Sequence, residues 1–418
     1  MNRAYDLIIK NAILNKNSAP VDIAVTDGTI ASISLSSNNE KRIQYLKDAQ
    51  TVYNAEDNFL CSGFFESHIH LDKACILERC EIKKGDLDEA VEETGKAKEN
   101  FTEKDVFERA SGVIEMAIKK GTMGLRTFVE TDLKTELRSF EAIKRVKNKY
   151  AFAIDIEICA FAQEGLTNSS ETQKLLKQAL SNGADLIGGC PYKDIDPVKH
   201  IEMIFDMAQE FDVNVDFHLD FDLDPNNSSI PKISEETIKR NYKGRVSIGH
   251  VTKISAMPKE KRKKMALLLS NAEITLTVLP ATDIFLNGRD YDTLIPRGMV
   301  NANELKTFGV NTTISSNNIL NAFTPYGDTS LARMANMYAN ITQLAKDEEI
   351  QEVYKMVTDN AAALLSLPCT IEVGAPATFI ILEAKNEIDA IRTISQPLVG
   401  FKNGRKTFSN DKAKIYFE

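Results

Sequence analysis

The residues best suited to chemistry lie in one stretch, Glu66-Ser-His-Ile-His-Leu-Asp-Lys73. It contains two of the five histidines found among 418 residues. His68 and His70 follow an apolar run, and in a β-strand residues two apart point to the same face. Two imidazoles on one face of a strand end can share a metal ion. The same pair could equally be polar residues on a solvated strand, and so short a motif does not decide between the two.

The elements that must position these residues begin at about residue 60, where short apolar runs start to alternate with amphipathic segments. The apolar runs predict eight strands, which end at His70, Glu130, Phe161, Cys190, Asp220, His250, Pro280 and Asn317. Helical patterns lie between them, among them 104–120, 136–148, 170–182, 198–211, 234–242 and 259–271. Alternating strands and helices indicate a parallel sheet in an α/β fold, and eight units indicate a closed (β/α)8 TIM-type barrel.

Short strand patterns separated by turns occupy both ends of the chain. Residues 377–382 and 391–393 are expected to be strands, followed by a hairpin at 402–405. We therefore predict a small β-sandwich formed by both chain ends, with residues 1–60 as its first part and 367–418 as its second. The barrel, residues 61–366, is inserted between them.

Four of the five histidines fall at predicted strand ends, where barrels of this kind carry their functional residues. His68 and His70 end the first strand, His218 lies near the end of the fifth, and His250 ends the sixth. His200 lies inside a helical pattern and is expected to be an ordinary surface residue. This convergence favours a metal site. Neutral imidazoles suit one divalent ion, Zn²⁺ first, with iron or manganese as alternatives.

The composition limits which classes of binding partner and which cellular compartment are expected. The net charge of −9 and the absence of a basic face or a long apolar window predict no nucleic-acid and no membrane binding. Six scattered cysteines without a C-x-x-C pair, and no export signal, predict a reduced, cytoplasmic protein. The expected partner is a small-molecule substrate.

With these residues placed, the sequence resembles the amidohydrolase superfamily and, within it, the cytosine deaminase-like branch. The resemblance covers nearly the whole chain and rests on several motifs in order. These are the opening segments 6–12 and 21–30, the first metal motif 63–73, the strand-3 motif 160–165, the strand-5 motif 217–220, the strand-6 motif 248–252, the strand-7 loop 279–289 and the returning sandwich segment 371–379.

The resemblance implies a role for each matched residue. It implies metal ligation by His68, His70 and His218, with Asn317 at the strand-8 ligand position. It assigns His250 to orienting or polarising the attacking water and Gln163 to the amide edge of the substrate. The extra sandwich domain in resembling proteins often supports dimerisation, so a homo-oligomer is also expected.

Two positions depart from the pattern of the branch. The strand-5 motif of the deaminases carries a glutamate that shuttles protons, and here that position is Phe221. The strand-8 position is normally an aspartate that binds the metal and accepts a proton, and here it is Asn317. A neutral amide can offer an oxygen to a metal but cannot act as a base at neutral pH. Each lost acid–base group typically costs ~10²–10⁴ in rate.

Carboxylates near these positions are candidates to take over the missing role. Asp220 is assigned a catalytic role, since it shares the face of His218 if the strand continues that far. Asp283, on the strand-7 loop, is assigned to substrate binding. Lys73 is interpreted as an ion-pair partner, with Asp72 as a candidate, rather than a nucleophile, and it is also placed among the substrate-binding residues.

Two functional hypotheses follow. The first is a metal-dependent amidohydrolase or deaminase-like enzyme that hydrolyses a non-peptide C–N bond of a small cyclic amide, amidine or N-heterocycle, with atypical acid–base residues. The second is a catalytically impaired protein of the same fold that binds a small ligand or has a regulatory role. The first depends on the histidines together with Gln163, and the second on Phe221 and Asn317.

Overall fold

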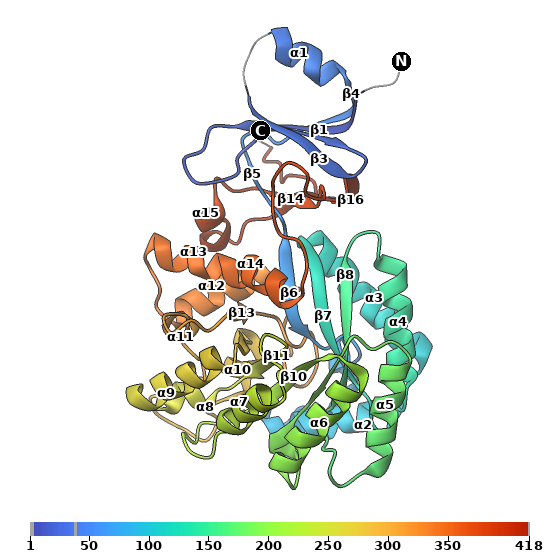
Figure 1. Cartoon of the computed structure of the whole chain (residues 1–418), viewed down its shortest axis with the longest axis vertical. Helices are drawn as coiled ribbons and strands as arrows, with labels where there is room; N and C mark the ends of the chain where they lie inside the picture. The colour runs from blue at the N-terminus through green and yellow to red at the C-terminus, as the bar shows by residue number, and fades with distance from the viewer. Residues whose placement is uncertain (1–3, 37–39, 417–418) are drawn as a thin grey trace.

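Eight parallel strands form one sheet in which each strand pairs with the next along the chain (Figure 1). They are β6 (Phe64–Ile69), β7 (Thr122–Glu130), β8 (Asp155–Ala162), β9 (Leu186–Gly189), β10 (Asn214–Leu219), β11 (Val246–His250), β12 (Thr275–Val278) and β13 (Thr312–Ile314). The computed structural model describes residues 4–36 and 40–416. The predicted barrel is confirmed, and its strands lie where the apolar runs placed them.

The barrel closes between β6, which carries His68, and the segment after β13, which carries Asn317. The backbone N–H of His70 donates to the carbonyl of Asn317 at 2.8 Å, and the N–H of Asn317 donates to the carbonyl of His68 at 2.9 Å. A bridge between Ile69 and Asn317 joins the last strand segment to the first. The closure itself therefore fixes position 317 against the His68–His70 pair.

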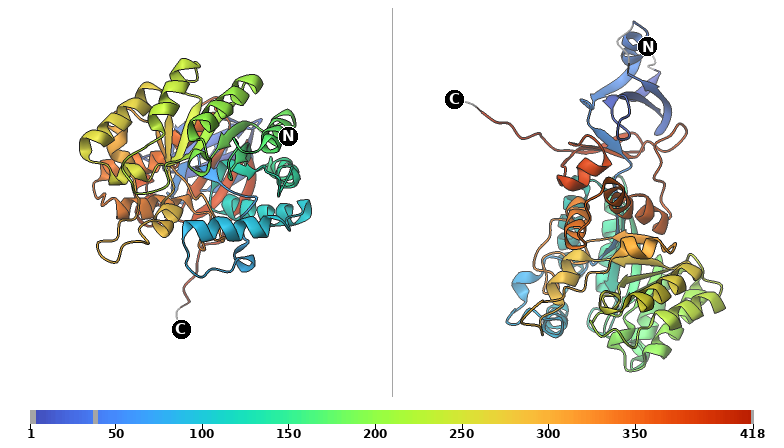
Figure 2. Two further views of the ribbon diagram at one scale, coloured as in Figure 1. Left: turned by 90° about the horizontal axis from the view of Figure 1, so that it is seen from below. Right: turned by 90° about the vertical axis from the view of Figure 1, so that its left-hand side faces the viewer.

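Helices surround the strands, as the view along the barrel shows (Figure 2). They are α2 (Leu87–Lys98), α3 (Glu103–Lys119), α4 (Arg138–Tyr150), α5 (Ser170–Ser181), α6 (Pro197–Phe211), α7 (Ile230–Lys239), α8 (Lys253–Ala256), α9 (Lys259–Asn271), α10 (Pro280–Leu286), α11 (Ala302–Lys306), α12 (Leu331–Ile341), α13 (Asp347–Met356) and α14 (Asp359–Leu364). Several begin at a capping side chain: Thr102, Ser169 and Asp196 each accept a bond from the N–H three residues ahead. Such caps satisfy N–H groups that a helix start leaves unpaired.

Both chain ends build a second region from two four-stranded sheets. One holds β1 (Tyr5–Ala12), β2 (Val21–Thr26), β3 (Thr29–Leu35) and β4 (Ala49–Asn54), next to α1 (Glu40–Lys47). The other holds β5 (Phe59–Cys61), β14 (Phe379–Leu382), β15 (Pro397–Lys402) and β16 (Arg405–Ser409). Leu7, Ile23, Phe379 and Phe401 belong to the core shared by the two sheets. The expected hairpin is present, but the strand expected at 391–393 is wrong, because Ile391 is buried on α15 (Glu387–Arg392).

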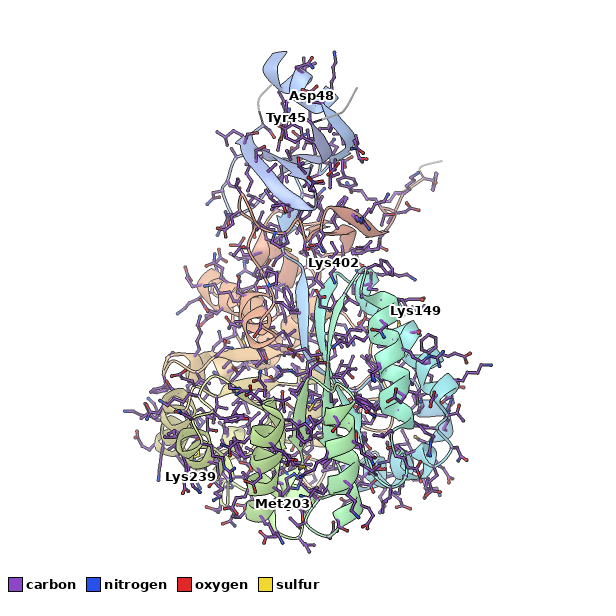
Figure 3. The ribbon with its side chains drawn as sticks, turned by 45° about the vertical axis from the view of Figure 1, so that its right-hand side comes forward. Tyr45, Asp48, Lys149, Met203, Lys239 and Lys402 are labelled. Carbon is purple, nitrogen blue, oxygen red and sulfur yellow. The ribbon has the colours of Figure 1, made fainter. Side chains whose placement is uncertain are left out.

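The two regions meet at the amino-terminal ends of the barrel strands. Only Ser62 and Gly63 separate β5 from β6, and Gly63 has a φ of +94° beside Met123, where a side chain would collide. Lys402, labelled in Figure 3, donates from Nζ to the carbonyl of Ala151 and to Asp155 Oδ1 at the start of β8. The carboxyl ends of the strands consequently lie on the face of the barrel that points away from the β-sandwich (Figure 1).

Among residues 4–36 and 40–416, no helix combines the length and apolar character that crossing a membrane requires.

Candidate metal centre

Three histidine side chains meet at one point inside the carboxyl-terminal mouth of the barrel. His218 Nε2 lies 3.0 Å from His68 Nε2 and 2.9 Å from His70 Nε2. His68 and His70 come from the end of β6 and His218 from β10, and all three are buried. Phe128 and Phe161 pack against the rings and hold them in place. The predicted convergence of these three histidines is confirmed.

The electrostatics of this cluster suit a cation. Burial, followed by nearby positive groups, holds the pKa of His68, His70 and His218 well below the usual 6.5. All three are therefore neutral at pH 7, which is the form that binds metals. Their Nδ1 atoms have no hydrogen-bond partner within the described residues. Three imidazole nitrogens this close, with their lone pairs facing one another, form a donor set that fits one divalent ion.

Asn317 lies across the barrel closure from His68 and His70 and offers a fourth donor atom. Its Oδ1 is buried without a hydrogen-bond partner in the part of the chain that the structure describes. Its Nδ2 lies 3.5 Å from His250 Nε2. A buried amide oxygen is costly when unpaired, so its position beside the histidines fits a fourth ligand. The backbone of Asn317 has a φ of +63°, a conformation that asparagine tolerates.

His250 is held by Asp283 rather than by the other histidines. Its Nδ1 lies 2.7 Å from Asp283 Oδ1, and Asp283 Oδ2 accepts from the N–H of Leu279. The carboxylate therefore fixes the imidazole orientation, with Nε2 toward Asn317. The structure places Asp283 behind His250 and outside the cavity lining. Geometry gives it a positioning role, and its predicted contact with substrate has no support from the described lining.

A small cavity of about 20 Å³ lies next to the histidines. Its wall is made by His70, Lys73, Leu87, Gln163, Tyr192, His218, Phe221, His250, Thr282, Leu286, Asn317, Asn318 and Phe323. Lys73 and Gln163, both predicted from sequence, are thus brought together here. The remaining apolar wall belongs to a cluster that includes Leu87 and Ala90 of α2, so α2 covers the mouth of the barrel.

Phe221 occupies the position where the resemblance expects a glutamate. Its ring packs edge-on against His250, with centroids 4.7 Å apart and planes 87° apart. The side chain is buried in the apolar cluster that also contains Leu286 and Phe323. A proton-carrying group is therefore replaced by an apolar surface that touches the remaining basic residue.

Lys73 connects the cavity to a second buried cluster. Its Nζ lies 2.5 Å from Glu130 Oε1 and 3.4 Å from Gln163 Oε1, and it stands over the Phe323 ring. The predicted ion pair of Lys73 is thus formed with Glu130. Asp72 instead accepts the N–H of Glu130. Lys98 of α2 approaches the other Glu130 oxygen at 2.6 Å. Burial alone would raise the pKa of Glu130, but the two lysines lower it, so the carboxylate stays ionised.

The structure does not bring Asp220 into the site. Ser228 Oγ donates to Asp220 Oδ2 at 2.6 Å, and the N–H of Ser229 donates to Oδ1 at 3.1 Å. The strand ends at Leu219, and Asp220 has a φ of +51°, so the alternation of strand side chains does not extend to it. Its carboxylate binds the start of α7 instead. The catalytic role predicted for Asp220 has no geometric support.

The expectation for His200 is wrong. Its side chain is completely buried, and Nδ1 lies 2.8 Å from Asp194 Oδ2. The ring fills the space above Gly189, where any Cβ would fall 2.0 Å from His200 Nε2.

Several wall residues escaped prediction. Tyr192 follows the end of β9 by three residues, so its place after a strand end was a usable signal. Leu87 lies on α2, and neither it nor Phe323 is close in sequence to the predicted ligands. Thr282 and Asn318 adjoin Asp283 and Asn317, but a single sequence does not say which neighbour of a functional residue faces the cavity.

Comparison with known proteins decides the family. A model of the amidohydrolase family matches residues 113–397. The chain belongs to this family. It is 26% identical to the N-isopropylammelide isopropyl amidohydrolase of Pseudomonas sp. strain ADP, over 97% of this chain and 98% of that protein.

Solved structures agree with this assignment. The 5-methylcytosine deaminase of Klebsiella pneumoniae, liganded with 5-fluorocytosine, superposes with a TM-score of 0.91 at 26% identity, covering 98% of this chain and 99% of that chain. The N-isopropylammelide isopropylaminohydrolase of Burkholderia multivorans has a TM-score of 0.81 at 20% identity, covering 96% and 97%. The second match supports the fold alone. Together with the barrel they confirm the predicted superfamily branch.

Proposed function

We propose that this amidohydrolase-family protein is a metal-dependent hydrolase acting on a non-peptide C–N bond of a small cyclic amide, amidine or N-heterocycle. The observation that carries the proposal is the meeting of three neutral imidazoles within 3.0 Å, beside a cavity that also contains His250 and Gln163. The similar proteins are named for N-isopropylammelide and 5-methylcytosine, which agrees with a ring substrate.

The donor set defines where a cofactor would bind. His68, His70, His218 and the Oδ1 of Asn317 would hold one divalent ion, with Zn²⁺ preferred and iron or manganese as alternatives. Such an ion supplies Lewis acidity and makes water a nucleophile near neutral pH. With an amide in place of a carboxylate at position 317, the site has less negative charge to balance the ion, so we expect metal affinity to be modest.

The other residues position substrate and protons. Asp283 holds the His250 ring so that Nε2 can accept or return a proton near Asn317. Lys73 donates to Gln163 Oε1, and Gln163 Nε2 donates one N–H to Cys190 Sγ, which leaves the other N–H to bind a substrate carbonyl. Phe221, Phe323 and Leu286 exclude water from the reacting bond.

A second candidate function is binding without turnover. It is favoured by the absence of a carboxylate from the described cavity wall, which leaves no aspartate or glutamate there to share proton transfer with His250. Proton transfer by a positioned group typically contributes ~10²–10⁴ in rate. Without such a group the same fold could retain a ligand and no longer convert it.

Metal content and product release test the proposal. We expect about one metal ion per chain after supplementation, and ammonia or amine release from a subset of N-heterocycles. His218→Leu should lose the metal, while His200→Asn, which changes the histidine outside the site, should keep it. Less than roughly a tenth of an equivalent of metal contradicts the proposal. Ligand binding without product release, together with activity only in the Phe221→Glu/Asn317→Asp double variant, favours the second function.

A further inference from the structure

Helix α10 faces the metal centre with one side and an open groove with the other. Thr282 and Leu286 line the cavity next to the histidines, whereas Ala281, Ile284 and Phe285 line the groove, which has a volume of about 690 Å³. The remaining residues of the groove are Arg289, Arg297, Thr324, Tyr326, Arg333, Met337 and Ile341. Aromatic residues, methionine and arginine are the types enriched where proteins bind one another. The groove therefore has the composition of a protein-binding surface.

The groove combines apolar surface with positive charge that has no carboxylate beside it. Tyr326 is 65% exposed, and its ring packs edge-on against Phe285 with the centroids 6.2 Å apart. Arg289 and Arg297 donate to backbone carbonyl groups. Neither of them forms an ion pair within the described residues, whereas Arg333 already pairs with a carboxylate. The segment that fits this groove is apolar and carries negative charge.

A protruding loop, residues 290–295, lies next to the groove, since Arg289 and Arg297 on either side of it line the groove. Its Leu294 is 99% exposed. The φ of Leu294 is +47°, a left-handed conformation that leucine adopts at a cost. The two ends of the loop are held close together, because a Cβ at Gly288 would fall 1.9 Å from a backbone oxygen on the opposite side. The fold thus presents a leucine to the outside of the molecule.

The 290–295 loop has the chemistry that the groove fits. Leu294 and Ile295 are exposed apolar residues. The carboxylates of Asp290 and Asp292 have no hydrogen bond and no ion pair in the part of the chain that the structure describes. Apolar and negative on the loop therefore match apolar and positive in the groove. Because the loop and the groove are neighbours on one surface, a twofold axis between two copies brings each loop to the groove of the other copy.

We propose that two copies of this chain pair through this surface, with the 290–295 loop of each copy in the groove of the other. Leu294 packs against the Phe285 and Tyr326 rings, and the two aspartates of the loop lie near the unpaired arginines. The interface belongs to the barrel, whereas the resemblance led us to expect one formed by the β-sandwich. The pairing does not depend on the proposed function, because neither the loop nor the groove contains a metal ligand.

Sedimentation velocity of the full chain over a range of concentrations tests the pairing. We expect the natural protein to have twice the mass of one chain, and Leu294→Asp to weaken the dimer at least about tenfold because it buries a charge in the interface. Leu294 makes almost no contact within its own chain, so this change should not disturb folding. Leu35→Asp, at the exposed end of β3 in the β-sandwich, is the matched control and should keep the dimer. A monomeric natural protein, or equal dimer strength in the two variants, overturns the proposal.

Charge reversal tests whether the loop and the groove are the surfaces that meet. Asp290→Lys/Asp292→Lys makes the loop positive, and Arg289→Glu/Arg297→Glu makes the groove negative. Each double variant should pair with itself at least about tenfold more weakly than the natural protein does, because like charges then face one another. A mixture of the two should regain the dimer, since the reversed loop of one meets the reversed groove of the other. A mixture that associates no better than its components overturns the proposal.

Metal content and product release keep this inference separate from the proposed function. Leu294→Asp should bind as much metal as the natural protein, because Leu294 does not line the cavity beside the histidines. A dimer that Leu294→Asp breaks supports the pairing even if the natural protein binds no metal, a result that refutes the proposed function alone. A protein that binds metal and releases product but stays monomeric, including one whose groove takes up a different partner, refutes the pairing alone.

Discussion

Two buried polar clusters lie at neighbouring strand ends and satisfy their atoms in opposite ways. The histidine cluster, His68, His70 and His218, has ring nitrogens within 3.0 Å and three Nδ1 atoms without a partner in the described chain. The lysine–carboxylate cluster consists of Lys98, Glu130, Asp132 and Glu164. Lys98 Nζ lies 2.6 Å from Glu130 and Asp132 and 2.8 Å from Glu164.

Both clusters contain groups that could hold a metal ion, since their ligand atoms lie within 4.8 Å of one another. Only the lysine–carboxylate cluster already contains its cation, which is the Lys98 ammonium. Its ion pairs fasten the end of α2 over the barrel mouth. The histidine cluster contains no charged group of its own, because its three imidazoles are neutral at pH 7. Proximity of ligand-type residues is therefore not enough to identify a metal site; ligand atoms that face one another without a lysine ammonium among them, as the three Nε2 atoms do, are the more specific sign.

The largest effect is expected from breaking the paired cluster. Lys98→Met removes the ammonium, which leaves Asp132 without its buried lysine partner and Glu130 with Lys73 alone. Removing one partner of a buried ion pair typically costs about 3–5 kcal/mol. We expect the free energy of unfolding, measured by urea denaturation, to fall by about this amount.

Lys96→Met provides the matched control on the same helix. Lys96 pairs with Glu92 and Glu93, but its side chain is 60% exposed. Exposed pairs contribute about 0–1 kcal/mol, so this change should be hardly detectable. Equal losses for the two variants would mean that the buried cluster contributes no more to the free energy of unfolding than an exposed ion pair does.

The histidine cluster could be predicted from the sequence because short stretches of sequence are enough to recognise the residues that form it. An H-x-H motif on a strand and two further histidines at strand ends fix the site once the eight apolar runs specify a barrel. The period of two residues along β6 places His68 and His70 on one face without any knowledge of the tertiary structure. Barrel geometry then brings His218 to them.

The paired cluster could not be predicted in the same way. Lys98 lies on a helix with many exposed charges, and nothing in its spacing separates it from Lys96. Its burial depends on where α2 packs, which is a tertiary property. The role assigned to Asp220 lacks geometric support for a related reason. Asp220 is the first residue after β10 and has a left-handed backbone conformation, which ends the alternation of strand side chains on which the assignment depended. His200 was missed because its burial depends on the space left by Gly189 on another strand.

An intermediate effect of the opposite sign is expected from the histidine cluster. In metal-free protein, His218→Leu replaces an imidazole with an unpaired buried Nδ1 by an apolar side chain that packs on Phe161. An unsatisfied buried polar group costs about 1–3 kcal/mol, so the variant should be as stable as the natural protein or more stable by up to that amount. Urea denaturation in the presence of a chelator measures this.

The same variant, measured with and without Zn²⁺, provides the control. The natural protein should gain stability with metal because the ion binds only the folded state, and His218→Leu should gain none. A large loss of stability in metal-free His218→Leu would show that the histidine cluster is held together as a structural element, like the lysine–carboxylate cluster, and would remove the contrast between them.

The smallest effect lies in the pH dependence of the metal-free protein. Burial holds the pKa of each site histidine well below 6.5 in the folded state, whereas the unfolded chain restores the usual value. At these three histidines the unfolded state therefore binds more protons below pH 6.5, so their contribution to the free energy of unfolding falls as the pH falls. Burial raises the pKa of Glu66 to about 7 and that of Asp72 to about 6, which acts in the opposite direction and is common to the natural protein and a histidine variant. Each histidine contributes a slope that approaches about 1.4 kcal/mol per pH unit as the pH falls well below 6.5.

Replacing one of the three histidines should reduce that slope by the same increment. Urea denaturation between about pH 7 and about pH 5 should give an average slope for His218→Leu that is lower by about 1 kcal/mol per pH unit. Glu130 does not interfere, because its lysine partners lower its pKa, so its stabilising contribution is lost only when the pH falls below the usual value of 4.5. Lys96→Met should keep the full slope. An unchanged slope in His218→Leu would place a proton on this imidazole in the folded protein, which is incompatible with three neutral donors facing one ion.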